Sequence, residues 1–203
     1  MSRIALIGAS GAVGSRLLKE LSDRGHTVTA IARHPEKIAG FPGVAAIQGD
    51  AADQGGLARL LAGHDVVISA VRFAGIEPSA LIEAVRASGV KRYLVVGGAG
   101  SLEIAPGKRL VDQPDFPEAY REEALRGAAF LDELRKESEL DWVFISPSAM
   151  FGPGERTGNF RLGQDALLST EQGSHISYED YAVALVDEIE HPAHSRQRFT
   201  VGY

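Results

Sequence analysis

Three glycines near the start of the chain have a spacing that could bind phosphate. An apolar run at 3–7 leads directly into Gly8-Ala9-Ser10-Gly11-Ala12-Val13-Gly14. In such a turn, free backbone N–H groups gather at the positive end of a helix dipole, where a pyrophosphate binds. We expect Gly8 to allow the tight turn, Gly11 to admit the phosphate, and Gly14 to let the helix pack closely. The expected phosphate contacts are Gly8, Ser10, Gly11, Ala12 and Val13.

The segments on either side of the turn favour a dinucleotide site over a turn that binds nothing. The spacing is G-x-x-G-x-x-G, whereas the simplest dinucleotide fingerprint is G-x-G-x-x-G. The following segment places Val13, Leu17, Leu18 and Leu21 on one face, as a helix packed on a sheet requires. The order strand, turn, helix is the order that a dinucleotide site needs.

Arg33 follows the second apolar run and bears on the type of nucleotide. A site specific for NAD usually has Asp or Glu here, about 20 residues beyond the glycines, to bind the ribose 2′-OH. An arginine suits a 2′-phosphate instead, because charge-assisted hydrogen bonds contribute about 1.5–3 kcal/mol. We therefore expect a preference for NADPH, with NADH as a possible substitute. The alternative is an exposed arginine at a strand end.

Two further strand ends carry candidate nucleotide contacts. Asp50 follows the third apolar run, where it could reach the adenine amino group or cap the next helix. Ala70, Val71 and Arg72 follow the fourth run, where we expect the adenosine ribose and the phosphates.

Alternating strands and helices predict an α/β fold of the Rossmann type, a doubly wound parallel sheet with its ligand at the carboxyl ends of the strands. The apolar runs that read as strands are 3–7, 28–32, 44–47, 66–68, 93–96, 142–145 and 198–201. The segments that read as helices are 12–24, 54–62, 78–88, 118–138 and 177–190. We expect one domain over 1–203, in which 147–203 forms a small substrate-side module.

Composition narrows the function classes. The formal net charge of −6 argues against a protein that binds the nucleic-acid backbone. The chain has no cysteine, which excludes disulfides, thiolate catalysis and cysteine-ligated metal. His191 and His194 lie three residues apart, but Pro192 separates them and no third ligand is evident, so no metal site is expected. No apolar stretch is long enough for a membrane span and no signal segment is evident, so the expected setting is the cytoplasm.

Several longer blocks of sequence resemble one family. They are 95–102 (VVGGAGSL), 141–147 (DWVFISP), 153–158 (PGERTG) with 161–163 (RLG), and 176–182 (ISYEDYA). With the glycine turn, these blocks make the chain similar over nearly its whole length to atypical short-chain dehydrogenases/reductases with an NmrA-like NAD(P)-binding domain. Within that group it looks most like the bacterial NADH-flavin reductase-like family.

The resemblance implies further site residues. Gly97 and Gly98, with Ala99, would line the nicotinamide side of the cleft, where glycines let a flat ring lie close to the backbone. Ser148 and Met150, with Pro147, would approach the same ring from the sixth strand. The expected substrate contacts are Phe151 and Arg156, of which Arg156 binds a flavin phosphate or is simply a solvated loop residue.

The chain lacks the acid that typical short-chain dehydrogenases use. None of its five tyrosines is followed by lysine four residues later, so there is no Tyr-x-x-x-Lys pair. A ketone would need such a placed acid, which contributes about 10²–10⁴-fold, whereas a conjugated ring spreads the charge itself. Ser101 is the candidate hydroxyl near the acceptor, or else a turn or cap residue; Tyr120 stacks on the acceptor or packs in the fold.

These observations predict an NAD(P)H-dependent oxidoreductase whose acceptor is a small conjugated molecule. A flavin is the first expectation and a quinone the second, with a tetrapyrrole or enone as a further possibility for the same site. FMN or FAD would be a substrate and not a bound prosthetic group, because the chain has one dinucleotide site. The alternative from another class is a non-catalytic NADP(H)-binding redox sensor of the NmrA-like type. The sequence leaves the oligomeric state open.

Overall fold

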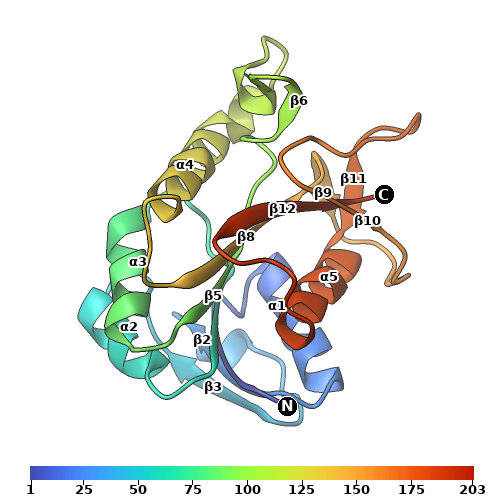
Figure 1. Cartoon of the computed structure of the whole chain (residues 1–203). Helices are drawn as coiled ribbons and strands as arrows, with labels where there is room; N and C mark the ends of the chain where they lie inside the picture. Colours follow the sequence, from blue (N-terminus) through green and yellow to red (C-terminus); the bar gives the residue numbers. More distant parts are fainter.

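The computed structural model describes residues 1–203 and is built on one central sheet (Figure 1). Its eight strands are β1 (Arg3–Ile7), β2 (Thr27–Ala32), β3 (Val44–Gln48), β4 (Val66–Ser69), β5 (Arg92–Val96), β8 (Asp141–Pro147), β10 (Arg161–Gly163) and β12 (Gln197–Gly202). They lie in the order β10-β12-β8-β5-β4-β1-β2-β3. All neighbours are parallel except β10 and β12. The predicted doubly wound Rossmann-type fold is confirmed.

Helices cover both faces of the sheet, as Figure 1 shows. They are α1 (Ala12–Asp23), α2 (Gln54–Leu61), α3 (Pro78–Ala87), α4 (Glu118–Leu134) and α5 (Tyr178–Glu190). The apolar faces of α1 and α5 belong to one buried cluster, and those of α2, α3 and α4 belong to another. None of these helices has the length and apolar character that crossing a bilayer requires.

The strands follow the two-residue period that separates these clusters. In β1, Ile4 and Leu6 pack in the cluster with α1 and α5, while Ala5 and Ile7 pack in the other. Because both faces are covered, a continuous apolar run is the pattern expected of a parallel strand. Because β1, β4 and β5 run parallel, their carboxyl ends meet at one edge of the sheet. The candidate site residues lie at this edge.

One helix is shorter than its sequence pattern predicts. The apolar pattern extends to 138, but α4 ends at Leu134. The carboxylate of Glu137 accepts hydrogen bonds from the backbone N–H groups of Glu139 (2.5 Å) and Leu140 (3.3 Å). These side-chain contacts replace helical ones, and the chain turns into β8.

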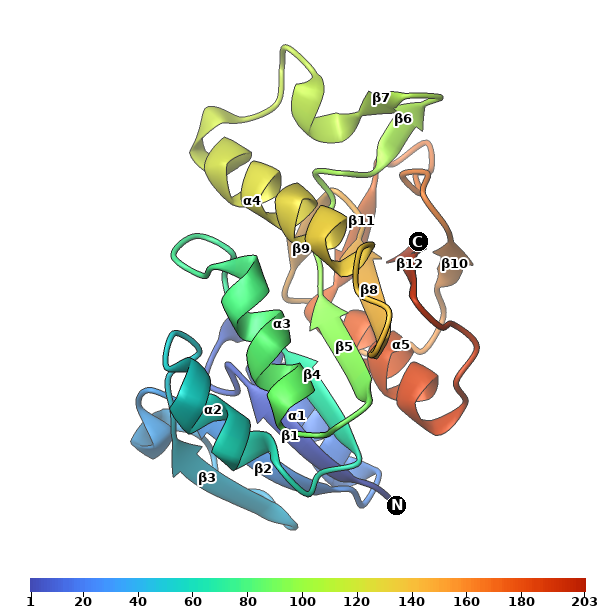
Figure 2. The same ribbon diagram turned by 60° about the vertical axis from the view of Figure 1, so that its left-hand side comes forward.

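Several short elements complete the chain. They are the 3₁₀ turns η1 (Pro35–Lys37) and η2 (Leu110–Asp112), the hairpin β6 (Glu103–Ala105) with β7 (Lys108–Arg109), and the parallel pair β9 (Met150–Gly152) with β11 (His175–Ser177). In Figure 2 the hairpin stands at the top of the molecule, with α4 below it.

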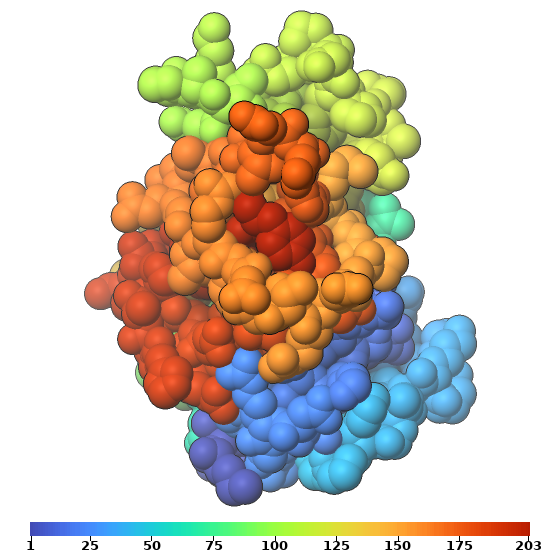
Figure 3. All heavy atoms as spheres, turned by 90° about the vertical axis from the view of Figure 1, so that its right-hand side faces the viewer, coloured from blue at the N-terminus to red at the C-terminus, as the bar shows by residue number.

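The C-terminal segment is joined to the rest of the fold in two ways. Strand β12 lies inside the main sheet, with Phe199 in register with Ile145 of β8. The side chain of Tyr203 donates a hydrogen bond to Asp180 on α5 (2.7 Å). Figure 3 shows the end of the chain (dark red) surrounded by the segment that contains β9 to β11 (orange).

Candidate functional site

The glycine turn between β1 and α1 has a backbone that other residues cannot reproduce. Gly8 has a φ of +83°, and a Cβ there would lie 2.4 Å from the carbonyl oxygen of Ala70. A Cβ on Gly14 would lie 2.1 Å from the carbonyl oxygen of Gly8. Gly14 therefore lets the helix approach the turn itself, which is a closer constraint than the helix-to-sheet contact expected from the sequence.

The first turn of α1 presents free N–H groups. Gly11 is the N-cap residue, and no side chain caps the helix. The backbone N–H groups of Ser10, Ala12, Val13 and Gly14 donate to no acceptor in the protein. A helix begins with several such unpaired donors and a partial positive charge, so this turn fits a diphosphate group.

Arg33 follows β2 and is exposed, and its guanidinium has no hydrogen bond or ion pair. Only its backbone carbonyl is engaged, accepting a hydrogen bond from the side chain of Gln48 (3.4 Å).

Asp50 follows β3, and its Oδ1 accepts a hydrogen bond from the backbone N–H of Ala52 (3.0 Å). Asp53 caps α2 instead, so the capping alternative for Asp50 is wrong.

The segment after β4 lies against the glycine turn. The N–H of Ala70 donates to the carbonyl of Ile7 (2.8 Å). The carbonyl oxygen of Ala70 is the atom that a Cβ on Gly8 would meet at 2.4 Å. Val71 Cγ1 would lie 3.1 Å from a Cβ at Gly8. The side chain of Arg72 is 82% exposed, with its Nε 3.9 Å from the carboxylate of Glu123.

Glu123 is a site residue that the sequence gave no reason to expect. It lies on α4, and its carboxylate accepts hydrogen bonds from the backbone N–H groups of Phe73 (2.7 Å) and Ala74 (2.9 Å). It thereby fixes the loop after β4, which carries Ala70 to Arg72. Two charge-assisted bonds from one carboxylate make this a firm attachment.

A cavity of about 410 Å³ opens beside this loop, and we call it the α4 pocket. Its lining comes from the loop after β4 (Phe73), the turn after β5 (97–100), the segment before α4 (Leu110, Gln113, 115–117), α4 (Tyr120, Glu123, Ala124) and the turn after β8 (Ala149, Met150). The volume lies in the range of roughly 300–1,000 Å³ that small-molecule sites have.

The glycines after β5 have different roles. A Cβ on Gly97 would lie 2.3 Å from the ring of Phe144, and one on Gly100 would lie 2.7 Å from Ala124 Cβ. These two glycines are therefore required by packing. A Cβ on Gly98 would meet nothing within 4 Å, so Gly98 offers bare backbone to the pocket. Gly98 is the position where a flat ring can lie against the main chain.

Tyr120 and Met150 are the exposed large apolar residues of the pocket. They are 67% and 71% exposed, and the Tyr120 hydroxyl has no hydrogen-bond partner in the protein. Large apolar side chains left open beside a cavity are typical of a binding surface.

The structure places Ser101, Ser148 and Phe151 outside the pocket lining. The Ser101 hydroxyl accepts a hydrogen bond from the buried Arg198 (3.0 Å), which fits the structural alternative for that residue. The Ser148 side chain is fully buried and donates to the carbonyl of Val201 (3.4 Å). The ring of Phe151 packs on Tyr181, with centroids 4.8 Å apart.

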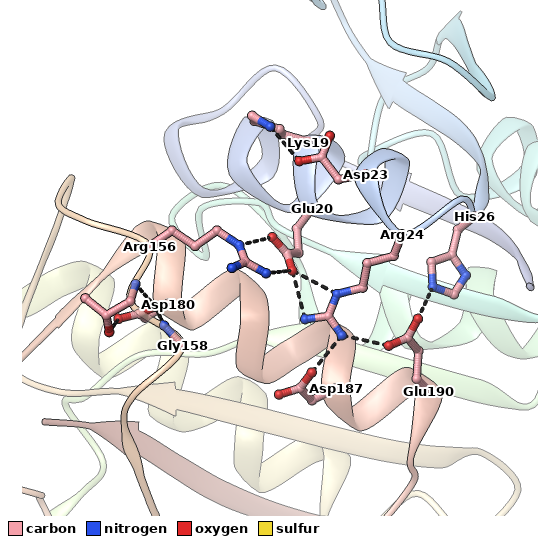
Figure 4. Close-up of polar contacts among 11 residues, drawn as sticks. Lys19, Glu20, Asp23, Arg24, His26, Arg156, Gly158, Asp180, Asp187 and Glu190 are labelled. Atoms are coloured by element: carbon pink, nitrogen blue, oxygen red, sulfur yellow. Dashed lines mark hydrogen bonds and ion pairs between the residues drawn. The ribbon is translucent and has the colours of Figure 1, made fainter.

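Arg156 is occupied elsewhere, so the expected flavin-phosphate contact is not formed by this conformation. Its guanidinium donates twice to the carboxylate of Glu20 on α1, with both distances 2.8 Å (Figure 4). Burial works to raise the pKa of Glu20, but the hydrogen bonds from Arg156 and Arg24 outweigh it and hold that pKa below its usual range. The α4 pocket lies on the other face of the sheet, with α4.

A second acid fixes the same loop to α5. Asp180 is fully buried and accepts hydrogen bonds from the N–H groups of Thr157 (2.8 Å) and Gly158 (2.7 Å) and from the hydroxyl of Tyr203 (2.7 Å). The loop that carries Arg156 is thus held by Glu20 and Asp180 together, and Figure 4 shows both attachments.

Comparison with known families places the chain among proteins that bind nicotinamide nucleotides. A family model described as NAD(P)H-binding matches residues 8–192, which includes the glycine turn and the α4 pocket. The chain belongs to this NAD(P)H-binding family. This confirms the NAD(P)H-binding family expected from the sequence, and the solved structures similar to the chain include a proposed NADH-flavin reductase.

Several proteins are similar over their whole length. The Bacillus subtilis protein YwnB is 41% identical, with 98% of this chain and 97% of YwnB covered. A Bacteroides thetaiotaomicron structure, proposed to be an epimerase, is 46% identical with a TM-score of 0.94, covering 99% of this chain and 96% of that one. A Streptococcus pneumoniae structure, the proposed NADH-flavin reductase, is 37% identical with a TM-score of 0.86, covering 100% and 99%.

Proposed function

We propose that this member of the NAD(P)H-binding family is an NADPH-dependent reductase of a flat conjugated acceptor, most simply a flavin or a quinone. The observation that carries the proposal is the α4 pocket, which is open, largely apolar, and bordered by the bare backbone of Gly98. The relative proposed to be an NADH-flavin reductase agrees with such an acceptor. FMN or FAD would then be a substrate that dissociates.

The cofactor is held by the turn after β1 and by residues that follow five other strands, β2, β3, β4, β5 and β8. The free N–H groups of Ser10, Ala12 and Val13 bind the diphosphate beside Gly8 and Gly11. The remaining contacts are Arg33 with the 2′-phosphate, Asp50 with the adenine, Ala70, Val71 and Arg72 with the ribose and phosphates, and Gly97, Gly98, Ser148 and Met150 on the nicotinamide side. Ser148 contributes through its backbone, because its side chain is buried.

The preference for NADPH rests on Arg33. Its guanidinium is exposed and forms no hydrogen bond or ion pair within the protein. A free arginine at this strand end gives a 2′-phosphate a charged hydrogen-bonding partner.

The chain's own residues bind and orient the acceptor. Tyr120 and Met150 supply apolar surface for a planar ring, and Gly98 lets that ring approach the main chain. The bound cofactor supplies a hydride from its nicotinamide ring. The pocket holds no lysine beside a tyrosine, so its residues favour an acceptor that delocalises the added charge without a placed acid. Ser101 is not assigned a role, because Arg198 holds its hydroxyl.

The competing proposal is a redox sensor that binds NADP(H) without turnover. A sensor needs no open cavity beside the nicotinamide, whereas a reductase needs one, and the α4 pocket favours the reductase. The test is NADPH oxidation at 340 nm with FMN, FAD, riboflavin or 1,4-naphthoquinone. Saturable, protein-dependent oxidation supports the reductase. Tight NADPH binding without any oxidation supports the sensor.

We also propose that 1–203 acts as one domain in the cytoplasm. The position of β12 within the main sheet supports the single domain, because the C-terminal segment shares its core with the rest. The cytoplasm supplies the reduced nicotinamide that the reaction consumes. Cell fractionation tests the compartment.

A further inference from the structure

The turn after β5 carries free backbone donors at the wall of the α4 pocket. Gly98, Ala99 and Gly100 line the pocket, and their N–H groups donate to no acceptor in the protein. Gly100 is buried, and a buried N–H group without an acceptor is rare in folded proteins. Since Gly100 lines the cavity, an oxygen atom of a bound molecule can supply the acceptor that the protein does not.

These donors are held in place by the turn itself. The carbonyl of Ala99 accepts a hydrogen bond from the N–H of Leu102, and the carbonyl of Gly100 accepts one from the N–H of Val111, both at 2.9 Å. A Cβ on Gly100 would lie 2.7 Å from Ala124 Cβ, so the turn also packs directly on α4. Donors that are fixed before a ligand arrives need little reorganisation when they bind it.

The two acidic residues of the lining do not occupy these donors. The carboxylate of Glu123 accepts hydrogen bonds from the N–H groups of Phe73 and Ala74 instead. Asp115 is exposed, and its carboxylate forms no hydrogen bond or ion pair. The N–H groups of the turn therefore stay available to a ligand.

Reduction of a quinone or a flavin places negative charge on the ring system, where a carbonyl oxygen can carry it. The hydride brings two electrons to the conjugated ring, NADPH is thereby oxidised to NADP⁺, and a π electron pair moves onto a carbonyl oxygen. This oxygen is an anion until water gives it a proton. In acyl-transfer enzymes, removing one donor to such an oxyanion lowers kcat by about 10²–10³-fold.

We propose that the N–H groups of Ala99 and Gly100 bind a carbonyl oxygen of the acceptor and stabilise the charge that it gains on reduction. The chain lacks the Tyr-x-x-x-Lys acid, and these two groups take its place by binding the charge without transferring a proton. This inference rests on the proposed reductase function, and it narrows the acceptor to a ring that carries a conjugated carbonyl oxygen.

The test is the pKa of a bound phenol, because a phenolate oxygen resembles the reduced acceptor and the measurement needs no turnover. The protein is saturated with NADP⁺, and bound 4-nitrophenol is titrated from about pH 5 to about pH 9 by the absorbance of its phenolate. No histidine lines the pocket, so no lining side chain ordinarily titrates in this range. We expect the phenolate to bind about tenfold more tightly than the neutral phenol, which lowers the pKa of the bound phenol by about one.

A backbone ester at residue 99 tests the cause. Ala99→lactate replaces the N–H with an oxygen atom and keeps the side chain, and the Gly98 carbonyl that the ester weakens accepts no hydrogen bond in the protein. Phenolate binding should weaken about tenfold and phenol binding less than about threefold.

Ala39→lactate is the matched control for the ester. The N–H of Ala39 is also without an acceptor, the carbonyl of Ile38 accepts no hydrogen bond, and neither residue lines the pocket. This control should leave the pKa of the bound phenol unchanged. Tyr120→Phe should leave it unchanged as well, because the variant removes only the hydroxyl of that lining residue.

The outcomes separate the two proposals. An equal pKa for free and bound 4-nitrophenol overturns the assignment in the wild type alone, and so does a pKa shift that Ala99→lactate leaves intact or Tyr120→Phe abolishes. Weaker NADP⁺ binding by Ala99→lactate, with the pKa shift of the phenol retained, would show that the N–H serves the cofactor instead. In each of these cases, NADPH oxidation by flavins leaves the reductase standing. If neither 4-nitrophenol nor 1,4-naphthoquinone binds to the NADP⁺-saturated protein, both proposals are wrong.

Discussion

The carboxylate of Glu123 on α4 accepts a 2.7 Å hydrogen bond from the backbone N–H of Phe73, fifty residues earlier in the chain. The same carboxylate takes the N–H of Ala74, and Glu123 also lines the α4 pocket. One side chain thus joins the proposed acceptor pocket to the loop proposed to contact the cofactor. A substitution at Glu123 should therefore affect both the acceptor pocket and the cofactor-contacting loop.

Glu123→Gln should lower the free energy of unfolding by about 1–3 kcal/mol, because the amide keeps one acceptor oxygen and turns its NH₂ toward a backbone donor. It should also weaken NADP⁺ binding several-fold through the loop after β4. Urea denaturation and an NADP⁺ titration measure the two effects. Glu122→Gln is the control and should change stability by less than about 0.5 kcal/mol. A variant at Glu123 with wild-type stability would contradict the proposed attachment.

Arg33→Glu should reverse the cofactor preference. Loss of the charge-assisted bonds should weaken NADPH binding by about one to two orders of magnitude, while the new carboxylate can accept the ribose 2′-OH of NADH. The measurement is the ratio of the NADPH and NADH dissociation constants. Arg59→Glu makes the same charge change on the exposed side of α2 and should leave the ratio intact. If Arg33→Glu still prefers NADPH, the assignment is wrong.

Gly8→Ala should destabilise the protein and abolish cofactor binding. Alanine is strained at a φ of +83°, and its Cβ would fall 2.4 Å from the Ala70 carbonyl oxygen. We expect a loss of about 3 kcal/mol or more in the free energy of unfolding. Gly63→Ala is the control, because Gly63 has a φ of +80° but nothing within 4 Å of its Cβ position. The free energy of unfolding of Gly63→Ala should fall by only about 1–2 kcal/mol. An equal fall in both variants would show that the contact between residue 8 and the Ala70 carbonyl does not add to the cost.

Tyr120→Ala should raise the KM for the acceptor about tenfold with little effect on NADPH binding, because it removes an aromatic surface from the pocket. Tyr120→Phe keeps the ring and should behave like the wild type within about twofold, since the hydroxyl has no assigned proton transfer. Steady-state kinetics with riboflavin separate the two variants. A loss of about 10² or more in kcat for Tyr120→Phe would show that the hydroxyl acts as an acid.

The central fold could be predicted because its signal is local. Strands such as β1 and β5 are short apolar runs, and α1 and α5 begin where a cap residue precedes an apolar face. The end of α4 was missed because Glu137 competes for backbone donors that a helix would use. The hairpin β6–β7 was missed because its strands are only three and two residues long (EIA and KR), too short to show a pattern of alternating apolar residues.

The proposed site was only partly accessible from the sequence for the same reason. The glycine turn is contiguous, so its residues could be named together. The partners of Arg156 and Phe73 are fixed by the fold and lie 136 and 50 residues away, with no local pattern to announce them. From the sequence, Arg156 in its glycine-rich loop has no visible partner. In the structure its partner is the carboxylate of Glu20 on α1.

Asp180 should make the protein sensitive to acid. Burial works to raise the pKa of this carboxyl, but hydrogen bonds from Thr157, Gly158 and Tyr203 outweigh it and lower the pKa below its usual value of 3.8. A group with a lowered folded-state pKa stabilises the fold above its unfolded-state pKa and loses that contribution as the pH falls through the folded-state value. The stabilisation by Asp180 is therefore complete near pH 7 and declines below about pH 4.

Asp180→Asn should accordingly cost about 2–4 kcal/mol at pH 7, because the amide NH₂ opposes backbone donors in a fully buried position. The difference from the wild type should shrink as the pH falls from 4 toward 2. Urea denaturation across that range measures it. Asp187→Asn, on the same helix but with a half-exposed carboxylate paired to Arg24, should cost less than about 1 kcal/mol. A pH-independent difference between Asp180→Asn and the wild type would show that the charge of Asp180 does not hold the 157–158 loop.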